Sequence, residues 1–313
     1  MSKIERWRNG MVGLATACAL IACGGGGTSS APVAAPSTLP QEVGAPALSN
    51  NISTDGLNWI NYRRSQAGMP VLAHNSVIDK AAQGHSDYQK LNNVVTHDQT
   101  PGLPGFTGAH LLQRLNNAGY SFGSATYAYG EVISATTNNS GFFMAEELIT
   151  AIYHRFVMFE PKFKEAGTGA ATNASGYTYF TSDFAANNGY GPGLGRSVLV
   201  SWPFNGQTGV QANFFSDYES PDPVAGANEV GYPVSVHADI DVVLGVSSFT
   251  IAPRGGALLA VKLLAKASDA ETPASAAAIV PLAVLKAGTT YDVNFSGTAD
   301  GAAISKSWSF TTK

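Results

Sequence analysis

The chain has 313 residues, enough for one large or two medium domains that each bury a core. Only 13% of the residues are charged, and the net charge of −4 includes a basic leader with Lys3, Arg6 and Arg8. Without that leader the remainder is more acidic, which argues against a nucleic-acid partner or electrostatic attraction to anionic lipid.

Residues 1–22 have the pattern of a bacterial lipoprotein signal peptide. A basic start precedes an apolar run that is too short for a transmembrane helix. The run ends Leu20-Ile21-Ala22-Cys23 and is followed by four glycines. This end resembles a lipobox, in which the chain is cleaved before Cys23 and a lipid on its thiol holds the protein to the membrane. The alternative is an ordinary secretory signal with an incidental cysteine.

The cysteine content has a consequence for the folded part. The only two cysteines are Cys18 and Cys23, both in or directly after the leader. No disulfide can therefore form in the remainder, and its stability must come from packing. Residues 23–50 are rich in Gly, Ser, Ala and Pro with almost no charge, which predicts a disordered tether.

A first domain is predicted over residues 51–190. Ser53 or Thr54 can cap its first helix. Its last helix should end at Pro161, because proline donates no backbone hydrogen bond and disfavours a helical Glu160. Helices are expected at 75–91, 109–118 and 141–160, and strands at 127–134, from Gly167 onward and at 177–184. Helices on both sides of a short sheet predict an α+β fold, specifically an α/β/α sandwich.

Short motifs follow one another in a fixed order through this domain. They are Ile60-Asn61-x-x-Arg64, Gly68-Met69-Pro70, Ala82-x-x-His85-Ser86, Thr96-His97, Arg114-x-x-x-Ala118-Gly119-Tyr120, Gly130-Glu131, His154-Arg155 and Pro161-x-Phe163-x-x-x-Gly167-x-Gly169. No single motif is diagnostic. In order and spacing the set resembles the bacterial form of the CAP superfamily (cysteine-rich secretory, antigen 5 and pathogenesis-related proteins), whose domain is also called SCP.

The resemblance implies a central cleft lined by His97, Glu131 and His154. Two imidazoles and a carboxylate can hold a divalent metal such as zinc and leave a position for water. Without a metal, a carboxylate beside an imidazole raises its basicity and could support general acid–base chemistry. A buried hydrogen-bond network that only orients helices and strands satisfies the same residues equally well.

The chain departs from the family pattern close to His154. Bacterial members usually have Ser-Pro-Gly before the His-Arg pair and a Trp one turn earlier. Here residues 151–153 are Ala-Ile-Tyr, and the Trp position holds Leu148. The family's Gly-Glu-Asn ends in Val132 instead of Asn. A ligand shared by the family therefore does not transfer automatically to this chain.

Several other residues are weaker candidates. Glu146 and Glu147 could add a second carboxylate, since Glu147 lies seven residues before His154 on one face of the predicted helix. His85 is expected to be a partly buried packing residue near the cleft. The chain has no Ser-His-Asp arrangement, phosphate loop or His-Glu-x-x-His motif, so an ordinary protease is not indicated.

A second domain is predicted over residues 195–313, after the glycine-rich break at 187–195. About seven short β-branched and aromatic runs over this stretch are typical of a β-sandwich. The segment from Leu285 to Phe295 resembles the tyrosine corner of bacterial immunoglobulin-like modules, in which Tyr291 would bond back to the preceding turn. Trp308 and Phe310 should lie on one face of the last strand.

These features together predict an exported protein anchored by lipid in the bacterial envelope, with Gly24 compatible with sorting to the outer membrane. Its CAP domain is expected to bind a metal ion, a small lipid-like molecule or both. One alternative is a metal-assisted hydrolase of envelope peptide or peptidoglycan. The other is a non-enzymatic adhesive or structural surface protein. The missing nucleophile motif favours a protein that is not an enzyme.

Overall fold

The computed structural model describes residues 42–313. The predicted signal peptide, Cys23 and most of the predicted tether lie outside the described residues. Residues 42–50 pack against the first helix, α1 (Ile52–Gln66). Glu42 forms an ion pair of 2.6 Å with Arg63, and the Ser49 hydroxyl donates to Asp55 at 2.7 Å. No helix in the described part of the chain is long and apolar enough to cross a membrane.

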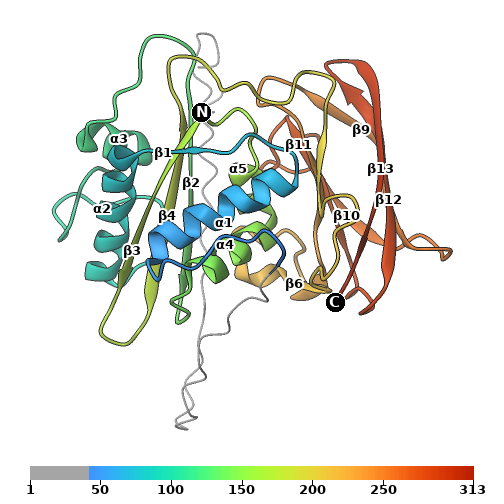
Figure 1. Cartoon of the computed structure of the whole chain (residues 1–313), viewed down its shortest axis with the longest axis horizontal. Helices are drawn as coiled ribbons and strands as arrows, with labels where there is room; N and C mark the ends of the chain where they lie inside the picture. Colours follow the sequence, from blue (N-terminus) through green and yellow to red (C-terminus); the bar gives the residue numbers. More distant parts are fainter. Residues whose placement is uncertain (1–41) are drawn as a thin grey trace, which may run out of the picture.

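The first structural unit is a four-stranded sheet between two layers of helices (Figure 1). The strand order is β1-β3-β4-β2, and only the β1–β3 pair is parallel. Helices α2 and α3 cover one face, and α1, α4 and α5 cover the other. The bounds are β1 (Ala73–His74), α2 (Ser76–Asn92), α3 (Leu111–Ala118), β2 (Ala128–Thr136), α4 (Gly141–Thr150), α5 (Ile152–Met158), β3 (Glu165–Thr172) and β4 (Thr178–Ala186). The mixture of helices and strands predicted for this unit is confirmed.

The Gly167-x-Gly169 motif lets α2 lie directly against β3. A Cβ atom at Gly167 would come within 2.2 Å of the backbone nitrogen of Asp79, and one at Gly169 within 2.2 Å of that of Gln83. Both distances are far below van der Waals contact. The two glycines are therefore required by close packing of backbone on backbone.

The start of α1 differs from the prediction. Asn51, not Ser53 or Thr54, caps the helix, and its side-chain oxygen accepts from the backbone N–H of Thr54 at 2.9 Å. All three residue types are good N-caps, so the sequence pattern does not discriminate between starts two or three residues apart.

The helix predicted over residues 141–160 is broken into two. Ala151 has an extended backbone (ψ 118°) and separates α4 from α5, and α5 ends at Met158 rather than at Glu160. The carboxylate of Glu219 accepts from the backbone N–H groups of Ile152 at 2.8 Å and Tyr153 at 2.6 Å. It thus supplies the acceptors that a continuous helix would have supplied. The expectation that Glu147 and His154 share one helix face is wrong, because the two lie on different helices.

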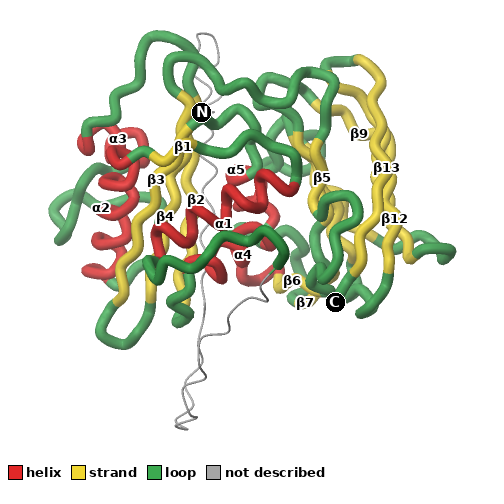
Figure 2. The backbone as a smooth tube through the Cα atoms, viewed as in Figure 1, coloured by secondary structure: helices red, strands yellow, loops and turns green. Residues whose placement is uncertain are grey.

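The second unit contains strands and loops but, among the described residues, only one short 3₁₀ helix, η1 (Ser216–Tyr218) (Figure 2). Its sheets have the orders β10-β11-β8-β5, β13-β12-β9 and β6-β7, and all strand pairs within them are antiparallel. The bounds are β5 (Val200–Trp202), β6 (Asn213–Phe215), β7 (Glu229–Gly231), β8 (Val234–His237), β9 (Leu244–Pro253), β10 (Val261–Ala265), β11 (Ala276–Pro281), β12 (Thr290–Ala299) and β13 (Ala302–Thr311). An all-β unit is therefore confirmed.

Three strands of this unit were not predicted, and two other predictions about it are confirmed. Strands β6 and β7 are only three residues long, and β11 begins with three alanines, which have weak strand propensity. Tyr291 accepts a hydrogen bond from the backbone N–H of Lys286 at 2.7 Å, so it does bond back to the preceding turn. Trp308 and Phe310 are both buried on one face of β13.

The two units share one hydrophobic core, and α5 with the residues that follow it forms the junction (Figure 1). Arg155 is fully buried and donates to the Pro233 carbonyl at 2.8 Å, with its guanidinium 5.1 Å from the centre of the Tyr232 ring. Phe159 meets the edge of Trp202 at 5.3 Å. Such packing resembles a domain interior rather than a loose contact between domains.

Candidate functional site

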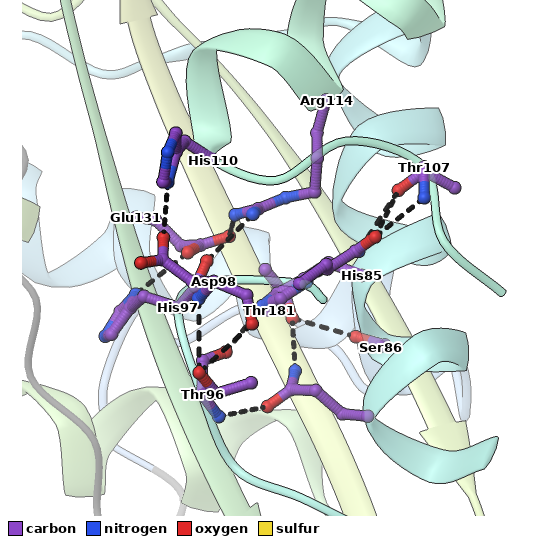
Figure 3. Close-up of polar contacts among 12 residues, drawn as sticks. His85, Ser86, Thr96, His97, Asp98, Thr107, His110, Arg114, Glu131 and Thr181 are labelled. Carbon is purple, nitrogen blue, oxygen red and sulfur yellow. Dashed lines mark hydrogen bonds and ion pairs between the residues drawn. The ribbon is translucent and has the colours of Figure 1, made fainter. Parts of the chain in front are cut away.

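His97 belongs to a buried chain of charged groups drawn from three elements (Figure 3). His97 lies in the loop between α2 and α3, Glu131 on β2 and Arg114 on α3. The imidazole Nδ1 is 2.8 Å from Glu131 Oε1, and Arg114 donates to Glu131 Oε2 at 2.6 Å. Arg114 also donates to the backbone carbonyl of His97 at 2.8 Å. The arginine therefore fixes both the carboxylate and the loop that carries the histidine.

The charge on Glu131 determines how His97 is oriented. Burial alone would raise the pKa of Glu131, but the Arg114 charge and the hydrogen bond from His97 hold it well below its usual range. An ionised carboxylate can only accept, so Nδ1 of His97 donates the hydrogen. In the neutral ring Nε2 then carries the lone pair. The His97 side chain keeps 14% of its surface exposed, whereas that of Glu131 keeps 3%.

Asp183 faces Glu131 from the neighbouring strand. The two residues are direct partners in the β2–β4 register. Burial and the negative charge of Glu131 raise the pKa of Asp183 well above its usual value. One member of this carboxyl pair is thus kept ionised by Arg114, and the other is pushed toward its neutral form.

His85 positions the loop that carries His97. Its Nε2 lies 2.7 Å from the Thr96 carbonyl, and its Nδ1 lies 2.9 Å from the side-chain nitrogen of Gln99. Burial lowers the pKa of His85 to about 4, so the ring is neutral at physiological pH. The packing role expected for His85 fits this geometry, and its burial is complete rather than partial.

His154 has a similar carboxylate partner, but that partner comes from the second unit. Its Nδ1 lies 3.1 Å from Oε1 of Glu219, the residue that directly follows η1, and both side chains are buried. Glu219 also accepts from three backbone N–H groups at the start of α5, including that of His154 at 3.2 Å. The Glu219 carboxylate is the acceptor in all three of these bonds. Because an ionised carboxylate can only accept, Nδ1 of His154 donates to it as well.

The predicted metal site consists of His97, Glu131 and His154. Residues 42–313 contain no group of three or more His, Cys, Asp or Glu side chains that could hold a metal ion. Both oxygens of Glu131 are engaged, one by His97 and the other by Arg114. Glu131 therefore fits a residue that orients His97 better than it fits a direct metal ligand.

Glu146 and Glu147 lie on α4 and make hydrogen bonds elsewhere. Glu146 accepts from Trp59 at 2.7 Å and from Arg63 at 2.8 Å. Glu147 accepts from the Ser134 hydroxyl at 3.1 Å. Both line a cavity at the junction with the second unit.

Sequence reasoning missed Glu219, and it left Arg114 out of the site. Arg114 was visible as part of the Arg-x-x-x-Ala-Gly-Tyr motif. Glu219 stands in no motif, and nothing near it in the sequence indicates a partnership with a histidine 65 residues earlier.

Comparison with known proteins identifies the first unit. Residues 57–184 match the sequence model of CAP, the cysteine-rich secretory protein family. This part of the chain is therefore a CAP (SCP) domain. The predicted resemblance is confirmed. No curated protein matches the chain.

Three solved structures are similar to part of the chain. An extracellular protein containing an SCP domain from Bacillus anthracis is 25% identical, with a TM-score of 0.36 over 43% of this chain and 40% of that one. An outer surface protein from Borrelia burgdorferi is 14% identical, with a TM-score of 0.35 over 42% of this chain and 90% of that one. A cysteine-rich secretory protein from Staphylococcus aureus is 17% identical, with a TM-score of 0.30 over 45% of this chain and 40% of that one. The match thus spans less than half the length of the first and third proteins.

Proposed function

We propose that this chain is an exported, lipid-anchored CAP-domain protein that binds a ligand through His97 and His154 and is not an enzyme. The observation that carries the proposal is the common geometry of the two histidines. Each ring donates from Nδ1 to a buried glutamate, Glu131 in one case and Glu219 in the other. In both cases the glutamate fixes the orientation of the imidazole ring.

The chemistry of this donor set favours a divalent metal such as zinc as the ligand. Metal-binding imidazoles usually donate their other ring N–H to a carboxylate, which fixes the tautomer and raises the basicity of the ligand nitrogen. Glu131 and Glu219 would have this supporting role, and a bound metal would supply a Lewis-acidic centre. A small lipid-like molecule is the other ligand class that the family resemblance implies.

The proposed location rests on the leader and on the arrangement of the units. The lipobox-like end at Cys23 supports a lipid anchor in the outer membrane, with residues after it as part of the tether. The second unit is proposed to be an immunoglobulin-like sandwich, and the Tyr291 hydrogen bond supports this fold. Its role would be to dock on α5 and supply Glu219 to the site.

Zinc titration by calorimetry tests the proposal. The wild-type protein should bind zinc, and His97→Ala combined with His154→Ala should abolish binding. Glu131→Gln and Glu219→Gln should each weaken it by about 10- to 100-fold, because each loses an orienting carboxylate. His110→Ala is the matched control, since exposed His110 has a carboxylate partner, Asp98, at 2.8 Å but lies outside the site. Zinc affinity that survives the double substitution would refute the proposal.

A purely structural role is the second candidate. It is favoured by the near-complete burial of Arg114 and Glu131, which pair with each other as a fold-stabilising network would require. Under this alternative, His97→Ala would lower the stability of the protein, and it would change the affinity for no ligand.

A further inference from the structure

A second candidate binding site lies away from both histidines, where α4 meets the second unit. It is a cavity of about 240 Å³. Phe143, Glu146 and Glu147 of α4 form one wall, and Phe214, Phe215 and Tyr218 of the second unit form the other. Neither His97 nor His154 lines it. The CAP domain therefore provides only half of this cavity.

The two carboxylates in the cavity have different partners. Glu146 is paired with Arg63 at 2.8 Å, an arginine that it shares with Glu42. Glu147 accepts one hydrogen bond, from Ser134 at 3.1 Å, and has no cationic partner in the described part of the chain. Burial raises the pKa of Glu147, as expected for a carboxylate without a counter-charge.

Aromatic rings complete the lining around Glu147. Phe215 and Tyr218 are stacked with their centroids 5.4 Å apart, and Phe143 faces the cavity from α4. Tyr218 is exposed and Phe215 is partly buried, so the aromatic wall is reachable from solvent. The π faces of such rings attract cations, and a nearby carboxylate adds charge complementarity.

We propose that this cavity binds the ammonium end of a primary alkylamine, with the ammonium on Glu147 and the alkyl chain against Phe143, Phe215 and Tyr218. A primary ammonium has N–H donors for the carboxylate, which a quaternary ammonium lacks. A water molecule occupies about 30 Å³, so a cavity of about 240 Å³ has room for a short alkylamine. A free small amine and a lysine side chain present the same group.

Calorimetry with n-pentylammonium chloride on the full-length protein tests the proposal, at a mildly alkaline pH that keeps Glu147 ionised and the amine protonated. Pentylammonium should bind, whereas pentanol, which lacks the charge, and pentanoate, which has the opposite charge, should not. Glu147→Gln should weaken binding at least tenfold, and Phe215→Leu, which keeps an apolar side chain but removes the ring, several-fold.

Asp217→Asn is the matched control. It removes one negative charge beside Tyr218 from an exposed side chain that does not line the cavity, and it should change the affinity less than twofold. The unfolding temperature of each variant separates lost binding from lost structure. Equal losses for Glu147→Gln and Asp217→Asn would overturn the proposal, because attraction would then be non-specific.

The source of the amine is distinguished by a second probe, Nα-acetyl-lysine methylamide. Binding of both amines supports the proposal with a lysine side chain as a possible source, and binding of pentylammonium alone supports it with a small free amine. Failure of both amines to bind a correctly folded protein would refute it. None of these outcomes depends on the zinc titration, since the histidines are not part of this cavity.

Discussion

The surroundings of His97 and His154 show two ways of building the same local chemistry. Each imidazole hydrogen-bonds through Nδ1 to a buried glutamate. For His97 that glutamate is 34 residues away in the same CAP domain, and Arg114 of the domain compensates its charge. For His154 it is 65 residues away, in the second unit, and it is stabilised by backbone N–H groups of α5.

The difference shows that Glu131 reaches His97 from within the CAP domain, whereas Glu219 reaches His154 from the second unit. Glu131 and Arg114 lie on the sheet and on α3, and His85 of α2 fixes the loop that carries His97. The His154 environment needs the second unit to be docked, because Glu219 arrives with that unit. Substitutions at the junction should therefore affect His154 and leave His97 unchanged.

The largest effect is expected from Arg155→Ala. Arg155 is fully buried and bonds to carbonyl groups on both sides of the junction, those of Ile149 and Pro233. Its removal leaves buried acceptors without donors and creates a cavity, which should lower the free energy of unfolding by about 3–5 kcal/mol. Urea denaturation followed by fluorescence and circular dichroism measures this loss.

The matched control is Arg254→Ala, which removes an exposed arginine paired with Asp292 and should change stability little. If Arg155→Ala proves no worse than this control, the junction contributes little to the fold. The comparison of the two histidines would then lose its physical basis.

A smaller, pH-dependent effect is expected from Glu160→Gln. Glu160 follows α5 and accepts from the backbone N–H of Ile240 across the junction at 3.0 Å. Burial raises its pKa from 4.5 to about 8, so between these values the folded protein holds a proton that the unfolded chain releases. This group should therefore make the free energy of unfolding fall by up to about 1.4 kcal/mol per pH unit as pH rises from 5 to 7.

Glutamine cannot titrate, and its carbonyl oxygen can still accept from Ile240. The stability of Glu160→Gln should thus decline less with rising pH than that of the wild type, as measured by urea denaturation at several pH values. Glu229→Gln, at an exposed glutamate on β7, is the control and should follow the wild-type curve. Parallel curves for Glu160→Gln and the wild type would contradict the prediction.

The smallest effects are spectroscopic and need no loss of stability. Nitrogen-15 NMR of the imidazoles should show the Nδ1–H form for His97 and His154. His85 should remain neutral until the pH approaches its pKa of about 4. Glu131→Gln should perturb the His97 signals, and Glu219→Gln those of His154. A Glu219→Gln spectrum in which His97 shifts as much as His154 would show that the two environments are not independent.

Much of the first unit could be predicted because its information is local or repeated in the family. The position of α2, the close-packing glycines of β3 and the pairing of His97 with Glu131 in one neighbourhood all follow from periodicity or from ordered motifs. The second unit was harder. Strands such as β11, whose burial is decided by neighbours rather than by its alanine-rich sequence, have no signature of their own.

The sequence by itself determined the CAP architecture and the all-β character of the second unit, and it singled out His97 and His154 as candidate site residues. Only the tertiary structure decided what surrounds His154. Residues 141–160 have local preferences for one continuous helix, and the break at Ala151 occurs where the Glu219 carboxylate provides acceptors for the next three N–H groups. A contact of this kind depends on how two units dock. The local propensities of the two segments do not predict such a contact.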